Sequence, residues 1–273
     1  MFEPGVMFWA ERDDLETVRS LGVRYGQLGI PGGMHLTDAV AARFKTALAA
    51  ADLTLVTVFA AYEGEDYADI PAVARTVGFV PRDTRAARLE RTLAVSDFAA
   101  QLGVGSVACH IGFVPEDPGD ADYVVVREMV RQVCDHAARH GQSFVLETGQ
   151  EPAAVLRRFI SDVDRANLGI NFDPANLILY GTGEPIAALR ELAPLVRSVH
   201  CKDGDWPVAG VEGALGVERP LGKGSVGIAR FVETLGRLGF SGPLNVERET
   251  EDQQERWRDL AEGVRLLRAL ARP

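Results

Sequence analysis

Short apolar runs alternate with longer amphipathic stretches along most of the 273-residue chain. Runs of four to seven residues rich in β-branched and aromatic side chains are typical of strands, and apolar residues spaced three and four apart are typical of helices. The predicted strands cover residues 6–9, 24–30, 53–59, 105–110, 143–147, 168–173, 196–200 and 242–247. The predicted helices cover residues 15–21, 37–51, 82–102, 122–139, 152–160, 174–179, 185–192, 226–238 and 253–271.

This regular alternation predicts a single (β/α)8 TIM barrel that occupies residues 1–273 as one domain. Barrels of this kind commonly take about 250 residues as one unit. A doubly wound open sheet is the alternative, and it should carry a glycine-rich phosphate turn after an early strand. No GxGxxG follows an early strand, since the one match lies late in the chain at residues 222–227, and GxxxxGK[ST] is absent, so the barrel is favoured.

Two long connections interrupt the rhythm. Residues 60–81 show little periodicity and are predicted to form an irregular loop, which could be a lid over the site or a plain surface insertion. Residues 203–224 are rich in glycine and are predicted to be an excursion between a strand and a helix. Near its end, residues 221–224 read Leu-Gly-Lys-Gly, which suggests either a phosphate turn or a tight bend.

Composition narrows the class of protein. The formal net charge of −10 argues against a nucleic-acid partner, because binding to a phosphate backbone depends on Lys and Arg. The three cysteines include no CxxC pair, which argues against a disulfide framework or a structural zinc site and favours the cytoplasm. No basic and apolar leader and no membrane-length apolar run is seen, so neither secretion nor membrane insertion is expected.

Four predicted strands end on a side chain that can bind a metal. These residues are Glu147, Asp173, His200 and Glu247, and the first three follow one another at intervals of 26 and 27 residues, about one βα unit each. The 203–224 excursion accounts for the longer interval before Glu247. Parallel strands of a barrel place their carboxyl ends at one mouth, so these side chains are expected to converge there.

Three carboxylates and one imidazole form a mostly hard ligand set. Such a set suits Mn²⁺, Mg²⁺ or Co²⁺, with Zn²⁺ as a further candidate. Without a cation, three acids at one barrel mouth would repel one another and raise their pKa values. We therefore expect Glu147, Asp173, His200 and Glu247 to hold one divalent metal ion.

Five motifs of the second half of the chain, LETG, NFDPAN, VHCKD, PLGKGSV and NVERE, begin at residues 146, 171, 199, 220 and 245. With them the chain resembles the xylose isomerase-like TIM barrels, specifically the sugar phosphate isomerase/epimerase family, which includes ketose 3-epimerases, inosose dehydratases and, more distantly, endonuclease IV. The resemblance implies a small-molecule carbohydrate substrate, the four metal ligands named above, and Glu147 and Glu247 as the acid/base pair. Barrels of this kind often pair through their helices, so a homo-oligomer is among the expected states.

The chemistry of these residues fits that role independently. A divalent ion that chelates neighbouring oxygens of a hydroxy-carbonyl compound acidifies the intervening C–H and stabilises an enediolate. Two glutamates facing each other across the substrate could then exchange protons with it, giving epimerisation or isomerisation. Loss of a β-hydroxyl would instead make the protein a lyase or dehydratase of a keto-polyol or keto-glycoside. A metabolite-binding barrel without catalysis is the alternative from another class.

The sequence departs from the ketose epimerases in two places. Those enzymes usually carry His three positions after the aspartate and Arg six after the histidine, where this chain has Asn176 and Trp206. Endonuclease IV needs additional histidines for three zinc ions, and this chain has five histidines in all. The predicted substrate-binding residues are His110, Asn176, Lys202 and Asp203, while the histidines at positions 35, 136 and 140 are assigned to loops or helix surfaces.

Overall fold

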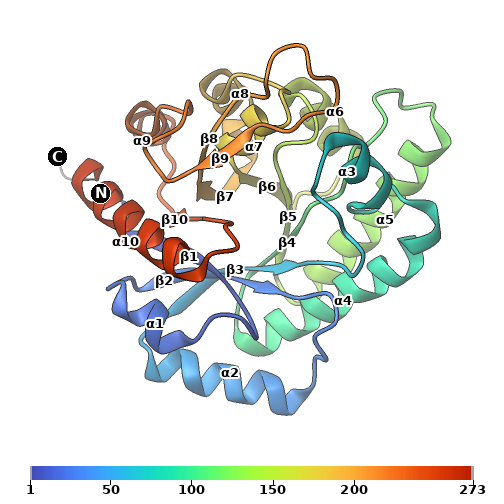
Figure 1. The fold of residues 1–273 in the computed structure, drawn as a ribbon. Coiled ribbons are helices and arrows are strands. Elements are labelled where there is room, and N and C mark those ends of the chain that lie inside the picture. The colour runs from blue at the N-terminus through green and yellow to red at the C-terminus, as the bar shows by residue number, and fades with distance from the viewer. Residues whose placement is uncertain (1, 272–273) are drawn as a thin grey trace.

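The computed structural model describes residues 2–271 and contains a closed barrel of parallel strands in the order β1-β10-β7-β6-β5-β4-β3-β2 (Figure 1). This confirms the predicted (β/α)8 architecture. The barrel strands are β1 Pro4–Trp9, β2 Tyr25–Ile30, β3 Thr54–Ala60, β4 Ser106–Cys109, β5 Ser143–Glu147, β6 Leu168–Phe172, β7 Val196–Cys201 and β10 Leu244–Val246.

Helices surround the barrel, and most of them cover the outer faces of its strands (Figure 1). They are α1 Leu15–Ser20, α2 Asp38–Ala50, α3 Ile70–Thr76, α4 Arg85–Leu102, α5 Ala121–Ala138, α6 Ala153–Val163, α7 Pro174–Leu179, α8 Pro185–Leu192, α9 Ile228–Arg237 and α10 Gln253–Leu270. Single 3-10 turns at Arg82–Thr84 and Ala193–Leu195 precede α4 and β7. Within residues 2–271, none of the helices is both long and apolar enough to cross a bilayer.

Local sequence signals set several helix ends. Thr37 caps α2 by accepting a hydrogen bond from the backbone N–H of Val40, as predicted from its position before the apolar-periodic segment. Gly103 ends α4 with a φ of 77°, a left-handed conformation that glycine adopts without steric cost. Proline at the first turn of α7 and α8 starts those helices where its missing N–H leaves no bond unmade.

The barrel interior contains both a polar group and a small apolar cluster. A polar group fastens strands across the interior, where Asn171 Oδ1 accepts from Gln27 Nε2 at 3.0 Å and from Ser198 Oγ at 2.6 Å. Met7 and Phe59 belong to a small apolar cluster inside the barrel, and this cluster is separate from the main core between strands and helices. The interior is therefore packed, which holds the side chains at the mouth in fixed positions.

The two long connections are more ordered than the sequence predicts. Residues 60–81 contain α3, which begins at the N-cap Asp69. Residues 203–224 contain an antiparallel hairpin of β8 Asp203–Asp205 and β9 Val217–Arg219. Two turns of helix and three-residue strands such as Asp-Gly-Asp are too short to show a period, and their stability comes from contacts between distant segments. One such contact joins the two insertions, where the N–H of Ile70 donates to the carbonyl of Gly213 at 3.0 Å.

Candidate metal centre

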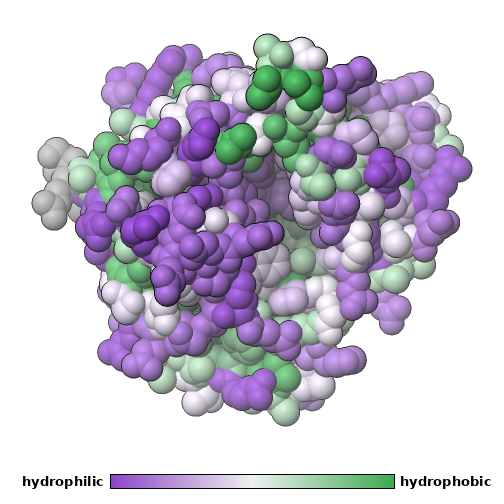
Figure 2. Space-filling model, viewed as in Figure 1, coloured by the Kyte–Doolittle hydropathy of each residue, from purple (hydrophilic) through white to green (hydrophobic). Residues whose placement is uncertain are grey.

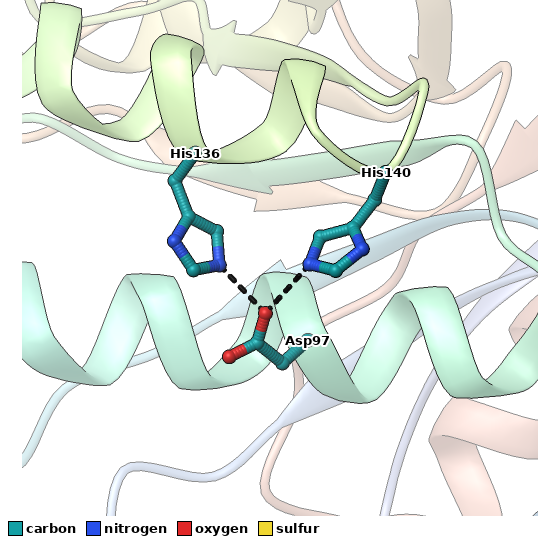
Figure 3. Close-up of side chains that lie close together, drawn as sticks. All are labelled: Asp97, His136 and His140. Carbon is teal, nitrogen blue, oxygen red and sulfur yellow. Dashed lines mark hydrogen bonds and ion pairs between the residues drawn. The ribbon is translucent and has the colours of Figure 1, made fainter.

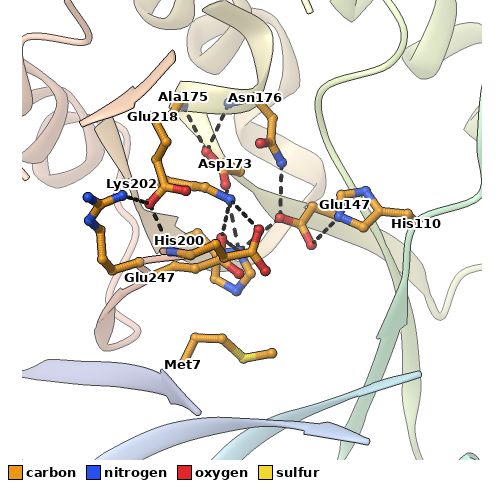
Figure 4. A network of polar contacts seen from close by, with 12 residues as sticks. Met7, His110, Glu147, Asp173, Ala175, Asn176, His200, Lys202, Glu218 and Glu247 are labelled. Atoms are coloured by element: carbon orange, nitrogen blue, oxygen red, sulfur yellow. Dashed lines mark hydrogen bonds and ion pairs between the residues drawn. The ribbon is translucent and has the colours of Figure 1, made fainter. Parts of the chain in front are cut away.

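Four neighbouring strands, β5, β6, β7 and β10, carry the candidate ligands to the mouth of the barrel. Glu147 is the last residue of β5, Asp173 follows β6 directly, His200 lies near the end of β7, and Glu247 follows β10. One ligand atom from each residue lies within 4.8 Å of the other three. The convergence predicted from the strand ends is therefore present, and Figure 4 shows the four side chains turned toward one another.

His200 Nδ1 lies at the centre of the carboxylates. It is 2.9 Å from Glu147 Oε1, 3.1 Å from Glu247 Oε2 and 3.8 Å from Asp173 Oδ2. All four side chains are buried, the most exposed being Glu247 at 7%. The His200 ring stacks on Phe59, with ring centroids 5.0 Å apart, so its orientation is fixed from below by an apolar surface.

Asp173 divides its two oxygens between a helix and the centre. Oδ1 caps α7 by accepting from the backbone N–H groups of Ala175 at 2.8 Å and Asn176 at 3.1 Å. Oδ2 is fully buried and has no hydrogen-bond partner among the residues described. Leaving a buried carboxylate oxygen unpaired is costly, and a cation at the point where the four ligand atoms converge would satisfy it. The residues present therefore fit a divalent metal ion.

The charges of the cluster also favour a cation. Burial raises the pKa of Asp173 to about 6. Burial alone would lower the pKa of His200, but the carboxylates of Glu247 and Glu147 outweigh it and raise that pKa well above its ordinary value. Without a bound cation, a proton on His200 balances the surrounding carboxylates. A metal ion would take over that task and displace the proton.

Each glutamate has its own polar partners. Glu147 accepts from Asn176 Nδ2 at 3.2 Å through Oε1, and its Oε2 lies 3.3 Å from His110 Nε2. Glu247 Oε2 accepts from Lys202 Nζ at 3.1 Å. Burial opposes ionisation of Glu247, but His200 and Lys202 outweigh it and hold the pKa of Glu247 well below its usual range. The two glutamates are thus held by different neighbours, a histidine on one side and a lysine on the other.

Two adjoining cavities of about 160 Å³ each open beside the centre. They share Tyr67, His110 and Glu249 in their walls, and the first cavity is lined by both Glu147 and Glu247. The remaining lining residues of the first cavity are Met7, Trp9, Phe59, Ala60, Ala61 and Glu65, and those of the second are Asn176, Leu179, Tyr180, Lys202, Leu215, Gly216 and Glu218. The space-filling view shows this mouth as a hollow bordered largely by hydrophilic residues (Figure 2).

Three of the four predicted substrate-binding residues line these cavities, namely His110, Asn176 and Lys202. Asp203 does not. Its side chain is buried and accepts hydrogen bonds from the backbone N–H groups of Gly204, Gly222, Gly224 and Val226 at 2.9 to 3.1 Å. Asp203 therefore organises its own loop, and its predicted role in binding the substrate is corrected to this structural one. The Leu-Gly-Lys-Gly turn presents its N–H groups to this carboxylate, as a phosphate turn would present them to an anion.

The sequence did not single out several residues of the site. Tyr67 comes from the 60–81 segment, whose irregular pattern gives no signal of a cavity wall, and it packs edge-on against His110 with ring centroids 5.9 Å apart. Glu249 accepts from Lys202 Nζ at 3.3 Å. The alternation in NVERE, which turns every second residue to the same side, was the one available signal for Glu249. Gln150 lies 3.2 Å from His110 Nδ1 and comes from a loop that follows β5.

The fold is a TIM barrel, and the buried acidic cluster at its mouth has ligand atoms that could hold a divalent cation. The family model of the xylose isomerase-like TIM barrel matches residues 15–270. The chain therefore belongs to the xylose isomerase-like TIM barrel family.

Solved structures agree with this assignment. A xylose isomerase domain protein from Planctomyces limnophilus is 43% identical, with a TM-score of 0.95 over 98% of this chain and 97% of that one. A xylose isomerase-like TIM barrel protein from Mycobacterium smegmatis in complex with magnesium is 21% identical, with a TM-score of 0.72 over 94% and 86%. D-psicose 3-epimerase from Clostridium cellulolyticum H10 is 16% identical, with a TM-score of 0.71 over 99% and 100%. None of the curated proteins compared with the chain matches it.

Proposed function

We propose that the protein is a divalent-metal-dependent isomerase or epimerase of a sugar or sugar derivative, with Glu147 and Glu247 transferring the protons. One observation carries the proposal. Glu147 and Glu247 each direct one oxygen to His200 Nδ1, where a cation would be bound, and both line the same cavity. Similarity to D-psicose 3-epimerase supports the fold on which such chemistry takes place.

The metal would be held by Glu147, Asp173, His200 and Glu247, and Mn²⁺, Mg²⁺ or Co²⁺ suits these ligands better than Zn²⁺. When bound, a divalent ion acidifies the C–H beside a carbonyl and stabilises the enediolate that forms on its deprotonation. Two further proposals concern the protein as a whole: residues 1–273 form a single domain, and the protein works in the cytoplasm.

The protein's own side chains would divide the proton chemistry. The carboxylate of Glu147 or Glu247 takes the proton from the substrate carbon, and its counterpart returns one to the opposite face or to the neighbouring carbon. The charges of His200 and Lys202 keep the Glu247 carboxylate ionised, and the hydrogen bond from Lys202 helps to fix its position. His110, 3.3 Å from Glu147 Oε2, would bind a substrate hydroxyl beside the reacting carbon.

The cavity walls favour a sugar without a phosphate. Besides Glu147 and Glu247, they carry the carboxylates of Glu65, Glu218 and Glu249, whereas Lys202 is the one lysine or arginine among the lining residues described. Lys202 already binds Glu247 and Glu249. Bringing a phosphate dianion next to like charges is costly, so kcat/KM for a ketose should exceed that for its phosphate ester by about 100-fold.

The proposal is tested by deuterium incorporation from D₂O into candidate ketoses and polyol ketones. The metal-loaded enzyme should exchange one carbon-bound hydrogen next to the carbonyl. Glu147→Gln and Glu247→Gln should abolish the exchange, while the matched control Glu191→Gln, an exposed glutamate on α8, should leave it unchanged. Exchange that persists in both active-site variants would disprove the assigned roles, and tight sugar binding without any exchange would indicate a binding protein.

The same geometry allows a second reaction, loss of water from the substrate. His110 faces both cavities and lies beside Glu147, so it could protonate a departing hydroxyl after Glu147 has removed the proton. A probable 3-DHS dehydratase from Bacillus anthracis shares the fold, at 15% identity. A dehydratase would form a conjugated product that absorbs in the ultraviolet, and a silent absorbance trace during deuterium exchange would leave isomerisation as the activity.

A further inference from the structure

A second group of metal-competent side chains lies on the outer surface of the barrel. Asp97 projects from α4, His136 from α5, and His140 from the turn that follows α5 (Figure 3). Asp97 Oδ1 is 2.6 Å from His136 Nε2 and 2.8 Å from His140 Nε2. Figure 3 shows both imidazole rings turned toward this one carboxylate oxygen.

The chain brings these residues together by simple geometry. His136 and His140 are four positions apart, about one helical turn, with His140 just past the end of α5, and α4 packs beside α5. Both helices end just before the strands they lead into, β4 and β5, so their last turns lie at the end of the barrel where strands begin. The candidate metal centre lies at the opposite end, where strands finish. The two groups are therefore independent.

We propose that Asp97, His136 and His140 form a second metal site, which takes Zn²⁺ or another late first-row divalent cation. Two imidazole nitrogens and one carboxylate oxygen are a borderline-soft set that suits Zn²⁺, Ni²⁺ and Cu²⁺, unlike the harder set inside the barrel. Three protein ligands leave a fourth tetrahedral position for water. A metal here joins α4 to α5 and so acts as a clamp on the barrel.

The three potential ligand atoms are Asp97 Oδ1, His136 Nε2 and His140 Nε2. In the absence of a metal, hydrogen bonds from the two imidazole N–H groups to Asp97 hold them together. Burial raises the pKa of Asp97, but the hydrogen bonds from His136 and His140 outweigh it and lower that pKa below its ordinary value. The carboxylate is thus ionised and ready to bind. Ligand atoms of a tetrahedral zinc stand about 3.3 Å apart, so the Asp97 oxygen needs to move away from each of the two nitrogens by only some tenths of an ångström. Asp97 and His140 are exposed and His136 is half-buried, so the two exposed side chains have room to make this movement.

Arg139 works against the metal. Its guanidinium donates to His136 Nδ1, which requires that nitrogen to be unprotonated. When His136 binds a metal through Nε2, its Nδ1 carries the proton instead and cannot accept from Arg139. Arg139 is exposed and can swing away, but its hydrogen bond and its positive charge both oppose cation binding. Removing this side chain should therefore strengthen the site.

The test is equilibrium dialysis against micromolar Zn²⁺ followed by metal analysis. The wild-type chain should bind two Zn²⁺ ions. His136→Gln/His140→Gln should bind one, and so should Asp173→Asn, which keeps the cap of α7 but disables the barrel centre. The combination of these three changes should bind none. Far-UV circular dichroism checks that each variant is folded.

Two further measurements separate a metal site from a plain ion-pair cluster. Arg139→Gln should bind the surface Zn²⁺ several-fold more tightly than the wild type. Zn²⁺ should raise the Tm of Asp173→Asn but not that of the combined variant. The proposal is overturned if the histidine variant binds as much Zn²⁺ as the wild type, or if Arg139→Gln binds Zn²⁺ no more tightly than the wild type.

Discussion

Replacing Asp203 by alanine should release the loop that borders the site. The carboxylate accepts from four backbone N–H groups, and two of these hydrogen bonds, from Gly204 and Val226, are buried. Each buried donor left without a partner costs about 1 to 3 kcal/mol, while the partly buried donors of Gly222 and Gly224 can turn to water at a smaller cost. The two buried donors together cost about 2 to 6 kcal/mol, and this cost falls on residues 203–227.

Asp203→Asn provides a graded test, because asparagine keeps one acceptor oxygen. This variant should lose roughly half of the stabilising free energy that Asp203→Ala loses. The matched control is Asp205→Asn on the same hairpin. Asp205 pairs with Arg219 at 2.7 Å at the exposed surface, and such pairs contribute at most about 1 kcal/mol. In Asp203→Ala, backbone amide hydrogen exchange followed by mass spectrometry should be faster across β9 and the following turn. The same variant should also incorporate deuterium into the substrate more slowly than the wild type.

The reasoning would be refuted if the backbone amides of Asp203→Ala exchanged as slowly as those of the wild type. It would also be refuted if Asp205→Asn increased amide exchange in the hairpin as much as Asp203→Ala does. A carboxylate that bound substrate instead of the loop would behave differently. Its removal would raise KM and leave the exchange pattern unchanged. The assay therefore separates the role that the structure gives Asp203 from the role that its place after His200 suggested.

Three more outcomes are expected. Metal affinity should rise with pH across the range where His200 and Asp173 lose their protons, since the pKa of His200 is raised and that of Asp173 is about 6; calorimetry in buffers of different ionisation enthalpy should detect proton release on binding. Lys202→Met should slow deuterium exchange by roughly 100-fold, because Glu247 loses the hydrogen bond that positions it and one of the two cations that keep it ionised, and an unchanged rate would exclude that role. Burial raises the pKa of Glu151 from 4.5 to about 7, so the folded state holds this proton more tightly than the unfolded state. Its contribution to stability is therefore present below pH 4.5 and lost as the pH rises to about 7, and urea titrations of Glu151→Gln should lack this decline.

The barrel could be predicted because its signals are local. Each strand is a short apolar run and each long helix has a one-sided apolar spacing, so the alternation is visible without any knowledge of contacts. The four candidate ligands could be predicted for the same reason, since the parallel barrel turns a position in sequence, the end of a strand, into a position in space. Correct prediction of the strand ends was therefore enough to identify Glu147, Asp173, His200 and Glu247.

What could not be predicted depends on contacts between distant segments. Helix α3 and the β8–β9 hairpin are too short for a periodic pattern, and they are tied together by the Ile70 to Gly213 hydrogen bond. Tyr67 reaches the cavity only because that insertion folds over the mouth. The N–H groups of the glycine turn donate to the carboxylate of Asp203, which lies in the same chain 19 residues before Gly222, and not to a bound phosphate. A pattern in the turn alone does not reveal where its anion comes from.

Asp173 shows how the fold and the site depend on each other. Its Oδ1 fixes the start of α7, and this fixes in turn the direction of Oδ2, which points into the cluster with no hydrogen-bond donor among the residues described. A free carboxylate would rotate to share its oxygens with any nearby donor, whereas this one is held by two backbone N–H groups. The helix therefore keeps one ligand oriented before a cation arrives, which reduces the ordering cost of binding. The same helix start brings Asn176 to Glu147 Oε1, so a single short segment orients ligands from two strands.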